Sequence, residues 1–342
     1  MMVWQSMAMA AVAVLVIPVA SAQQVFENRA AAGDLRSVRV ENIAGSVKVV
    51  TWDEPEIWFS ATAERDVEDV VLSMNDTAAE ISVRVPKGNA RKIKTDVQVK
   101  APPGTRVEIK TVSADIYYQG LASSVDAQSV SGNINLEVDA DEVRAKTVSG
   151  DAFVTGRAGN FYGDTTSGNL KLTAAGSEAD LESISGDLTI EGDRDRLQAS
   201  TTSGNINASG QIREFEGDSI SGDIRVETVQ QSFEAASTSG NIKVEGGPLE
   251  DLEVRSISGD ITYSGGLAQN ADFDCNSKSA NINITIPRES SVRFDLRSFS
   301  GNMRGDGAPD DSRSKSKSFQ WGTGEAEINA ESFSGDITIH GR

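Results

Sequence analysis

Residues 183–205 read SISGDLTIEGDRDRLQASTTSGN, so the phrase SISGD at 183 is answered by TTSGN at 201, eighteen residues later. Ser or Thr opens every copy of this five-residue phrase, and Ser holds the third place in every copy. Self-similarity at a fixed period predicts a repeat architecture. The copies start at 111, 129, 147, 165, 183, 201, 219 and 237, always eighteen residues apart, and four looser copies start at 256, 277, 298 and 332.

The residues between the phrases alternate in polarity. Apolar Ile134 and Leu136 alternate with Asn135 and Glu137, and this period of two predicts a half-buried strand. Apolar residues also fill the fifteenth place of the unit, which predicts a second strand. Counting in steps of two from the fifteenth place predicts that the side chains of the first and third residues of the next phrase point into the core and that of the second points outward. Gly at the fourth place then allows a corner where a side chain would clash.

Eighteen residues at about 3.3 Å each span roughly 60 Å, which suits one flattened turn of a β-solenoid. The sequence therefore predicts an all-β, single-stranded β-solenoid with about 18 residues per coil, of either hand. A unit of 36 residues remains the alternative, because residue two of the phrase alternates as well. That unit needs walls longer than ordinary strands.

The fifth residue of the phrase forms a predicted corner column in which Asp and Asn alternate. Stacked Asp side chains would repel one another one coil apart. Interleaved Asn spaces the carboxylates at about 9 to 10 Å, where exposed charges are largely screened. The column comprises Asp115, Asn133, Asp151, Asn169, Asp187, Asn205, Asp223, Asn241, Asp260 and Asn281.

The flanks of the repeat suggest the domain organisation. Residues 1–22 are uncharged and end in Ala20-Ser21-Ala22, which predicts a secretory signal peptide. Residues 23–110 are expected to form an N-terminal β region and cap, in which 41–49 is a degenerate copy of the repeat and Trp52, Trp58 and Phe59 cover the core. Residues 111–342 form the solenoid, with an inserted exposed loop at 304–326, whose Arg304-Gly305-Asp306 we interpret as accidental.

The composition disfavours several function classes. Lys and Arg number 32 against 51 Asp and Glu, and the net charge of −19 disfavours nucleic acid and anionic lipid partners. Cys275 is the single cysteine, so no intramolecular disulfide can form, and His340 is the single histidine. These residues cannot supply a zinc site, and one corner Asp in alternate coils is too little for calcium. We expect no metal, no cofactor and no catalytic residues.

The S-x-S-G-[DN]-I phrase, with KAPPGTRVEIKTVSADI leading into it, resembles the bacterial "putative adhesin" family of exported β-strand-repeat domains of unknown function. The resemblance covers residues 37–342. It implies a β-solenoid in the cell envelope and brings no catalytic residues with it. Ala114 and Ala280 replace the glycine of the phrase, which should alter only local corner geometry.

The sequence predicts a noncatalytic, exported, periplasmic, cell-surface or secreted binding or scaffold module. A carbohydrate-active enzyme with an acidic groove along the coils is the alternative, since stacked coils bring carboxylates together. Partners would be an envelope protein, a polysaccharide or other copies of the chain, with no transmembrane segment in the mature chain. The candidate contact surface is the outward ridge of second-place residues, of which Ile184, Ile220, Ile257, Phe299 and Phe333 are the large apolar members.

Overall fold

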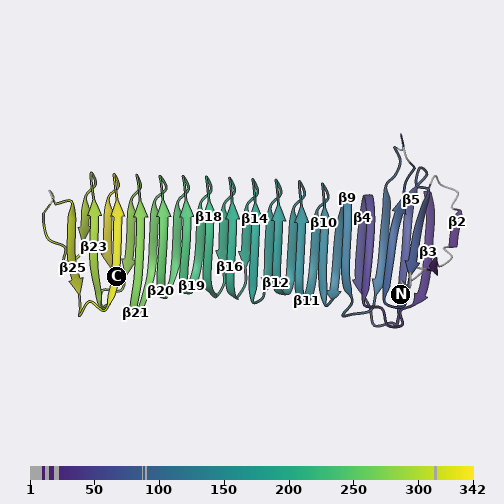
Figure 1. Ribbon diagram of the computed structural model, residues 1–342, viewed down its shortest axis with the longest axis horizontal. Helices are drawn as coiled ribbons and strands as arrows, with labels where there is room; N and C mark the ends of the chain where they lie inside the picture. The colour runs from purple at the N-terminus through teal and green to yellow at the C-terminus, as the bar shows by residue number, and fades with distance from the viewer. Residues whose placement is uncertain (1–9, 12–14, 19–22, 87, 89–90, 312–313) are drawn as a thin grey trace, which may run out of the picture. The chain divides into compact units, whose positions relative to one another are not determined.

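The computed structural model describes residues 10–11, 15–18, 23–86, 88, 91–311 and 314–342. The chain divides into two compact units, residues 1–168 and 169–342, and the boundary falls inside the repeat. Among the described residues all regular structure is β, with no helix. The expected all-β class is confirmed, and Figure 1 shows the strands of each unit side by side.

Parallel pairing with an offset of eighteen residues organises the repeats of each unit. In the first unit, Ile134 pairs with Ala152. In the second, Ile206 lies between Leu188 and Ile224. One repeat is therefore one coil of a β-solenoid-like stack, and a 36-residue coil is ruled out. We name each coil by the first residue of the phrase at its corner, so coil 183 comprises that corner with β14 before it and β15 after it.

The strands of the first unit are β1 (Ala10–Ala11), β2 (Leu15–Pro18), β3 (Gln23–Ala31), β4 (Ser37–Thr51), β5 (Glu56–Glu64), β6 (Asp69–Met74), β7 (Ala78–Arg84), β8 (Thr95–Ala101), β9 (Arg106–Leu121), β10 (Ser124–Ser129), β11 (Ile134–Thr147) and β12 (Ala152–Thr165). Those of the second are β13 (Leu170–Ala175), β14 (Glu178–Ser183), β15 (Leu188–Glu191), β16 (Arg194–Thr201), β17 (Ile206–Ser209), β18 (Ile212–Ser219), β19 (Ile224–Ser237), β20 (Ile242–Ser256), β21 (Ile261–Ser277), β22 (Ile282–Ile286), β23 (Val292–Ser298), β24 (Met303–Gly305), β25 (Ser316–Trp321), β26 (Ala326–Ser332) and β27 (Ile337–Gly341).

The core lies inside each coil, where the apolar places predicted from the alternation are buried. Ile206, Ile224 and Val226 are fully enclosed at the sixth and eighth places. The fifteenth place carries larger side chains, and Phe215 stacks on Phe233 with ring centroids 5.0 Å apart. Cys275 is buried in the same core, and burial raises the pKa of its thiol to about 12.

The last coils of the second unit do not stack in the order of the chain. β26 and β27 pair in parallel with β21 and β22 on one side. On their other side they pair in parallel with β23 and β24. Coil 332, the last in sequence, therefore lies between coils 277 and 298, as the yellow C-terminal strand of Figure 1 shows. The expected stacking in sequence order is wrong at this end.

The segment 304–326, expected to be an exposed loop, contains structure. Arg304 and Gly305 belong to β24, and β25 pairs antiparallel with β23. Phe319 of β25 stacks on the buried Phe294, with ring centroids 4.6 Å apart. The loop interpretation is corrected, because this segment covers the open edge and the apolar end of coil 298.

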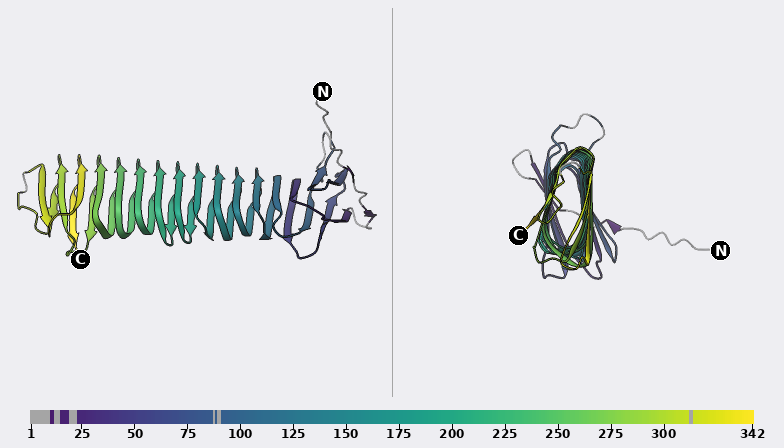
Figure 2. Two further views of the ribbon diagram at one scale, coloured as in Figure 1. Left: turned by 60° about the horizontal axis from the view of Figure 1, so that its bottom comes forward. Right: turned by 90° about the vertical axis from the view of Figure 1, so that its left-hand side faces the viewer.

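At the N-terminal end of the first unit, additional strands likewise pair with the edge of the parallel coils. β4 pairs in parallel with β9, and Gly45 lies opposite Ala114 in the place that the degenerate copy predicts. The opposite edge of β4 pairs with β7 and β8, which come later in the chain. β5 then adds antiparallel to β8, and β3 to β5, so antiparallel strands lie outside the parallel coils (Figure 2).

Most of the predicted signal peptide, residues 1–22, lies outside the described residues. Its described parts are β1, which pairs with β6, and β2, which pairs with β3. A search of the described residues finds no helix with the length and apolar character needed to cross a membrane.

Candidate binding surface

The phrase builds a tight corner in every coil. The first-place side chain is buried, and its hydroxyl accepts a hydrogen bond from the N–H of the fourth residue, as in Gly132 N to Ser129 Oγ at 2.8 Å. Thr111 donates to Ser129 Oγ of the next coil at 2.9 Å, a contact of the predicted hydroxyl ladder. The third-place serine is exposed, as at Ser131, so its predicted inward direction is wrong. The strand ends at the first place, and period-two parity ends with it.

The fourth place requires glycine because the backbone of the neighbouring coil approaches closely. A Cβ on Gly222 would lie 1.7 Å from the carbonyl oxygen of Gly204. Ala280, which departs from the pattern, still donates its N–H to Ser277 Oγ at 2.9 Å. The corner hydrogen bond therefore persists at the exception.

The fifth-place residues stack as predicted, and their hydrogen bonds explain the alternation better than screening does. Asp187 Oδ1 accepts from Asn205 N at 2.8 Å and from Asn205 Nδ2 at 3.1 Å. Asn205 Oδ1 in turn accepts from Asp223 N at 3.0 Å. Asn205, Asn241 and Asn281 thus each donate the side-chain amide to the Asp before them and accept with the side-chain oxygen from the coil after them. An Asp in place of any of them would lose the donor.

The alternation continues through the rearranged end of the second unit. Asp336 N donates to Asn281 Oδ1 at 3.0 Å, and Asn302 N donates to Asp336 Oδ1 at 2.7 Å. In sequence Asn281 is followed by Asn302, but in space Asp336 lies between them. The column therefore alternates by position in the stack.

The second-place side chains point outward, as predicted, and form the ridge in each unit. In the second unit Ile184 and Ile220 are each 53% exposed, and Phe299 and Phe333 are 56% and 55% exposed. The two phenyl rings stack at 4.9 Å, because coils 298 and 332 are neighbours. The structure thus brings together two predicted residues that lie 34 positions apart. Other exposed ridge members are Val112, Val130 and Val148 in the first unit and Ile257 in the second.

A groove runs beside the C-terminal end of the second unit's ridge. Its volume is about 670 Å³, and the stacked Phe299 and Phe333 form part of its wall. Lys315 closes one end, with Nζ 3.5 Å from the centroid of the Phe299 ring. Four cations and one carboxylate line this groove: Arg255, Lys278, Arg297, Lys315 and Glu331. In a chain of net charge −19, this is a local inversion of charge.

The model of the Toastrack DUF4097 family matches residues 44–234 and again 195–340, which together cover most of the chain. The chain belongs to the Toastrack DUF4097 family. No protein of curated function matches the Toastrack chain in sequence.

Solved structures similar to the Toastrack chain include three bacterial proteins. One is named a "putative adhesin", from Parabacteroides merdae, with 13% identity over 70% of this chain and 95% of that one, and a TM-score of 0.36. Another is a "putative cell adhesion protein" from Clostridium sporogenes, with 10% identity, coverage of 92% and 99%, and a TM-score of 0.20. The third is a "putative lipid binding protein" from Parabacteroides distasonis, with 15% identity, coverage of 92% and 96%, and a TM-score of 0.25.

Trp52 and Trp58 of the Toastrack chain do not cap the core as predicted, whereas Phe59 is fully buried. The two indoles are half-buried and line an open pocket of about 450 Å³. Lys100 Nζ lies 5.3 Å from the Trp52 ring centroid and 5.2 Å from that of Trp58. The alternation of β5 places Trp58 on the outward side between the buried Ile57 and Phe59, a signal that could have found the pocket, whereas Trp52 follows the end of β4. Cations already lie over these ring faces, so the pocket offers a ligand little aromatic surface.

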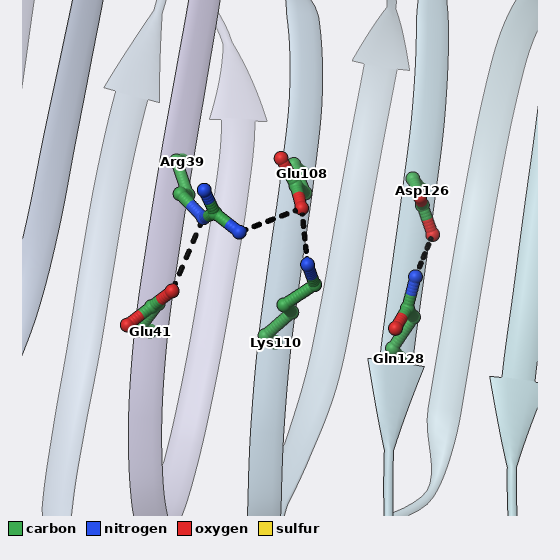
Figure 3. Close-up of polar contacts among 6 residues, drawn as sticks. All are labelled: Arg39, Glu41, Glu108, Lys110, Asp126 and Gln128. Atoms are coloured by element: carbon green, nitrogen blue, oxygen red, sulfur yellow. Dashed lines mark hydrogen bonds and ion pairs between the residues drawn. The ribbon is translucent and has the colours of Figure 1, made fainter.

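Several outward carboxylates of the first unit are paired with cations, whereas Asp126 accepts from the neutral Gln128. Glu108 accepts from Lys110 Nζ at 2.6 Å and from Arg39 Nη2 at 3.1 Å, and Arg39 also contacts Glu41 (Figure 3). Lys110, followed by Arg39, lowers the pKa of Glu108. Such a carboxylate stays ionised, whereas a general acid needs a raised pKa.

Asp218 in the second unit differs, because burial and then the nearby Glu216 raise the pKa of its carboxyl. A glycosidase would need a second carboxylate to act with it. Glu216, two residues away, is held by Gln198 Nε2 at 2.7 Å and Arg196 Nη2 at 3.0 Å. The neighbouring carboxylate is thus engaged by surface partners.

Proposed function

We propose that the chain is a noncatalytic, adhesin-like binding or scaffold module built on a single-stranded β-solenoid. Its contact surface is the ridge of the second unit, and its partner is an envelope protein, a polysaccharide or another copy of the chain. The observation that carries the proposal is the exposure of the ridge. Ile184, Ile220 and Ile257 are about half exposed at the corners, where connecting segments ordinarily carry polar side chains.

The state of the carboxylates supports a noncatalytic role over the carbohydrate-active alternative. A glycosidase needs one carboxyl with a raised pKa and a second carboxylate facing it across the substrate. Glu108 has a lowered pKa and two cationic partners. Burial and then the carboxylate of Glu216 raise the pKa of Asp218, and Glu216 is itself hydrogen-bonded to Arg196 and Gln198.

We further propose that the module is exported. The support is the uncharged, apolar segment of residues 1–22 with Ala20-Ser21-Ala22 at its end. N-terminal sequencing of the protein from its native host is the test, and the expected first residue is Gln23. A mature protein that begins at Met1 would contradict export by cleavage.

The ridge is tested with the triple variant Ile184→Lys, Ile220→Lys and Ile257→Lys. Binding of residues 23–342 to a glycan array and to immobilised envelope proteins is expected to be lost, while the circular dichroism spectrum is kept. The matched control is Thr189→Lys, Asn207→Lys and Thr262→Lys, which adds the same charge at outward places of the strands that follow the corners. Retained binding by a folded ridge variant would move the site elsewhere, and degradation of a bound glycan would contradict the noncatalytic role.

A further inference from the structure

We propose that the groove beside Phe299 and Phe333 binds a linear acidic polysaccharide, a chain of sugar units that carry carboxylates. This inference rests on the proposed binding function and names the ligand class for one end of the ridge. It follows from the placement of the groove's cations, the orientation of its aromatic rings and its neutral hydrogen-bonding groups.

The cations follow the direction in which the coils stack. Arg255 belongs to coil 256, Lys278 to coil 277 and Arg297 to coil 298, and Lys315 lies at the β25 end. One cation therefore occurs in nearly every layer of the groove. Arg255 also forms an ion pair with Glu253, so Lys278, Arg297 and Lys315 should attract an anionic ligand more strongly than Arg255 does. A ligand with charges repeated along its length satisfies such a row better than a single small anion does.

The stacked phenyl rings favour an anion as well. Their planes lie within 7° of parallel, so each ring covers a face of the other, and Lys315 covers the outer face of Phe299. Both faces of Phe299 and one face of Phe333 are thus covered, and the ring edges along the side of the stack carry the positive part of the aromatic quadrupole. A carboxylate is attracted to these edges, and the apolar carbon of a sugar ring can rest against them.

Asn276 and Glu331 distinguish a sugar acid from a simple polyanion. They occupy the same outward row as Arg255 and Arg297, with Glu331 paired in register with both Asn276 and Arg297. The carboxylate of Glu331 repels any polyanion to some extent, but it also accepts hydrogen bonds from hydroxyl groups, which a sugar acid carries and a polyanion without hydroxyls lacks. The ligand must therefore carry both anionic groups and hydroxyl donors.

The test measures binding of a linear oligogalacturonate to residues 23–342 by isothermal titration calorimetry. The first comparison probe is the same oligosaccharide fully methyl-esterified, which keeps the chain and removes its charges. The second is poly-glutamate, which keeps carboxylates without hydroxyls. We expect binding of the free acid, weakening as salt is added, and much weaker binding of both comparison probes.

Lys278→Glu with Lys315→Glu should weaken oligogalacturonate binding by about tenfold or more, because two attractions become repulsions. Lys278→Gln with Lys315→Gln is the milder variant if the reversal disturbs folding. The matched control is Lys171→Glu with Lys243→Glu, which reverses two exposed charges on another outward row of the same unit. The control should bind as the parent does.

Three results would overturn the inference: equal binding of the esterified chain, equal binding of poly-glutamate, or full affinity in the folded groove variants. The ridge experiment separates this failure from failure of the proposed function. If oligogalacturonate does not bind but the Ile184, Ile220 and Ile257 variant still loses another partner, the ligand class is wrong and the binding module stands.

Discussion

At the scale of single residues, the corner glycine shows how a neighbouring coil sets the identity of a residue. The corner places the carbonyl oxygen of one coil against the Cα of the next, so a Cβ added to a corner glycine such as Gly222 would overlap it, whereas Ala114 and Ala280 occupy the same place in two other coils. The position is therefore constrained by packing between coils. The preference for glycine does not require an unusual backbone angle at these places.

Gly222→Ala should lower the free energy of unfolding by about 2 kcal/mol or more, because its Cβ would lie 1.7 Å from Gly204 O. Gly266→Ala is the control, since its Cβ would meet Pro248 at an ordinary 3.5 Å. Thermal or urea unfolding of the two variants checks the difference. Equal stability of both variants would show that the coils are spaced more widely at the corner.

At the scale of elements, the corner column links consecutive coils through side chain to backbone hydrogen bonds. Asn205, Asn241 and Asn281 each donate an amide N–H to the Asp of the preceding coil, at 3.1 to 3.2 Å. The predicted relief of charge repulsion is thus accompanied by a direct bond. This adds a contribution that salt cannot replace.

Changing Asn205, Asn241 and Asn281 together to Asp should lower the melting temperature at low salt. Added salt should restore only part of the loss, because it screens repulsion but does not return the amide donors. The opposite change, Asp223→Asn, keeps an acceptor oxygen for Asn241 N and should have little effect. Full recovery of the Asn-to-Asp variant at high salt would show that repulsion alone explains the alternation.

The order of the last coils makes a second prediction for elements. Removing residues 326–342 deletes β26 and β27, which are the parallel partners of β23 and β24. The backbone amides of residues 292–321 should then lose protection from hydrogen exchange, while those of the strands up to β22 keep their protection. Removing residues 289–342 entirely is the control, with the same protection of the earlier coils. Continued protection of 292–305 in the first truncation would mean that coil 298 can stack on coil 277.

Much of this fold can be predicted from the sequence, because period-two alternation gives the direction of most strand residues. The inward Ile206 and the outward Asn207 both follow from it. The third-place serine could not be predicted in this way, since the chain turns between the second and fourth places. The position of coil 332 was missed, although the column contained the signal: Asn281 and Asn302 need Asp336 between them.

The candidate groove was predictable only in part. Phe299 and Phe333 were recognised as ridge residues, but their contact depends on the insertion of β26 between β21 and β23. Lys315 and Arg297 lie in different segments, which the antiparallel pairing of β25 with β23 brings together. Lys315 belongs to the cationic run SRSKSKS at 312–318, but the strand that pairs with this run cannot be read from the sequence.

At the scale of the whole molecule, a repeat protein is a series of neighbours, and its stability depends on how well each coil matches the next. In the second unit the backbone and the side chains repeat over different lengths. The backbone repeats in every coil, but the residue type in the corner column, Asp or Asn, repeats only in every second coil. Two coils are therefore the smallest segment that can be removed without placing like residues together.

Deleting residues 201–236 removes two coils and places Asn241 after Asp187. Deleting residues 201–218 removes one coil and places Asp223 directly after Asp187. The shorter deletion should be less stable than the longer one by about 1 to 2 kcal/mol, although it leaves a larger core. Urea unfolding of the two proteins at equal pH and salt provides the comparison. If the one-coil deletion is as stable as the two-coil deletion, the alternation has no energetic role.

The position of β26 and β27 also has a consequence for the timing of folding. Synthesis proceeds from the N-terminus, so residues 292–305 leave the ribosome before their parallel partners β26 and β27 have been translated. Coils up to 277 can assemble one after another as they emerge, but coil 298 has no parallel neighbour until Gly341 is made. Synthesis of residues 326–342 therefore sets the moment at which β23 and β24 can gain their parallel neighbours.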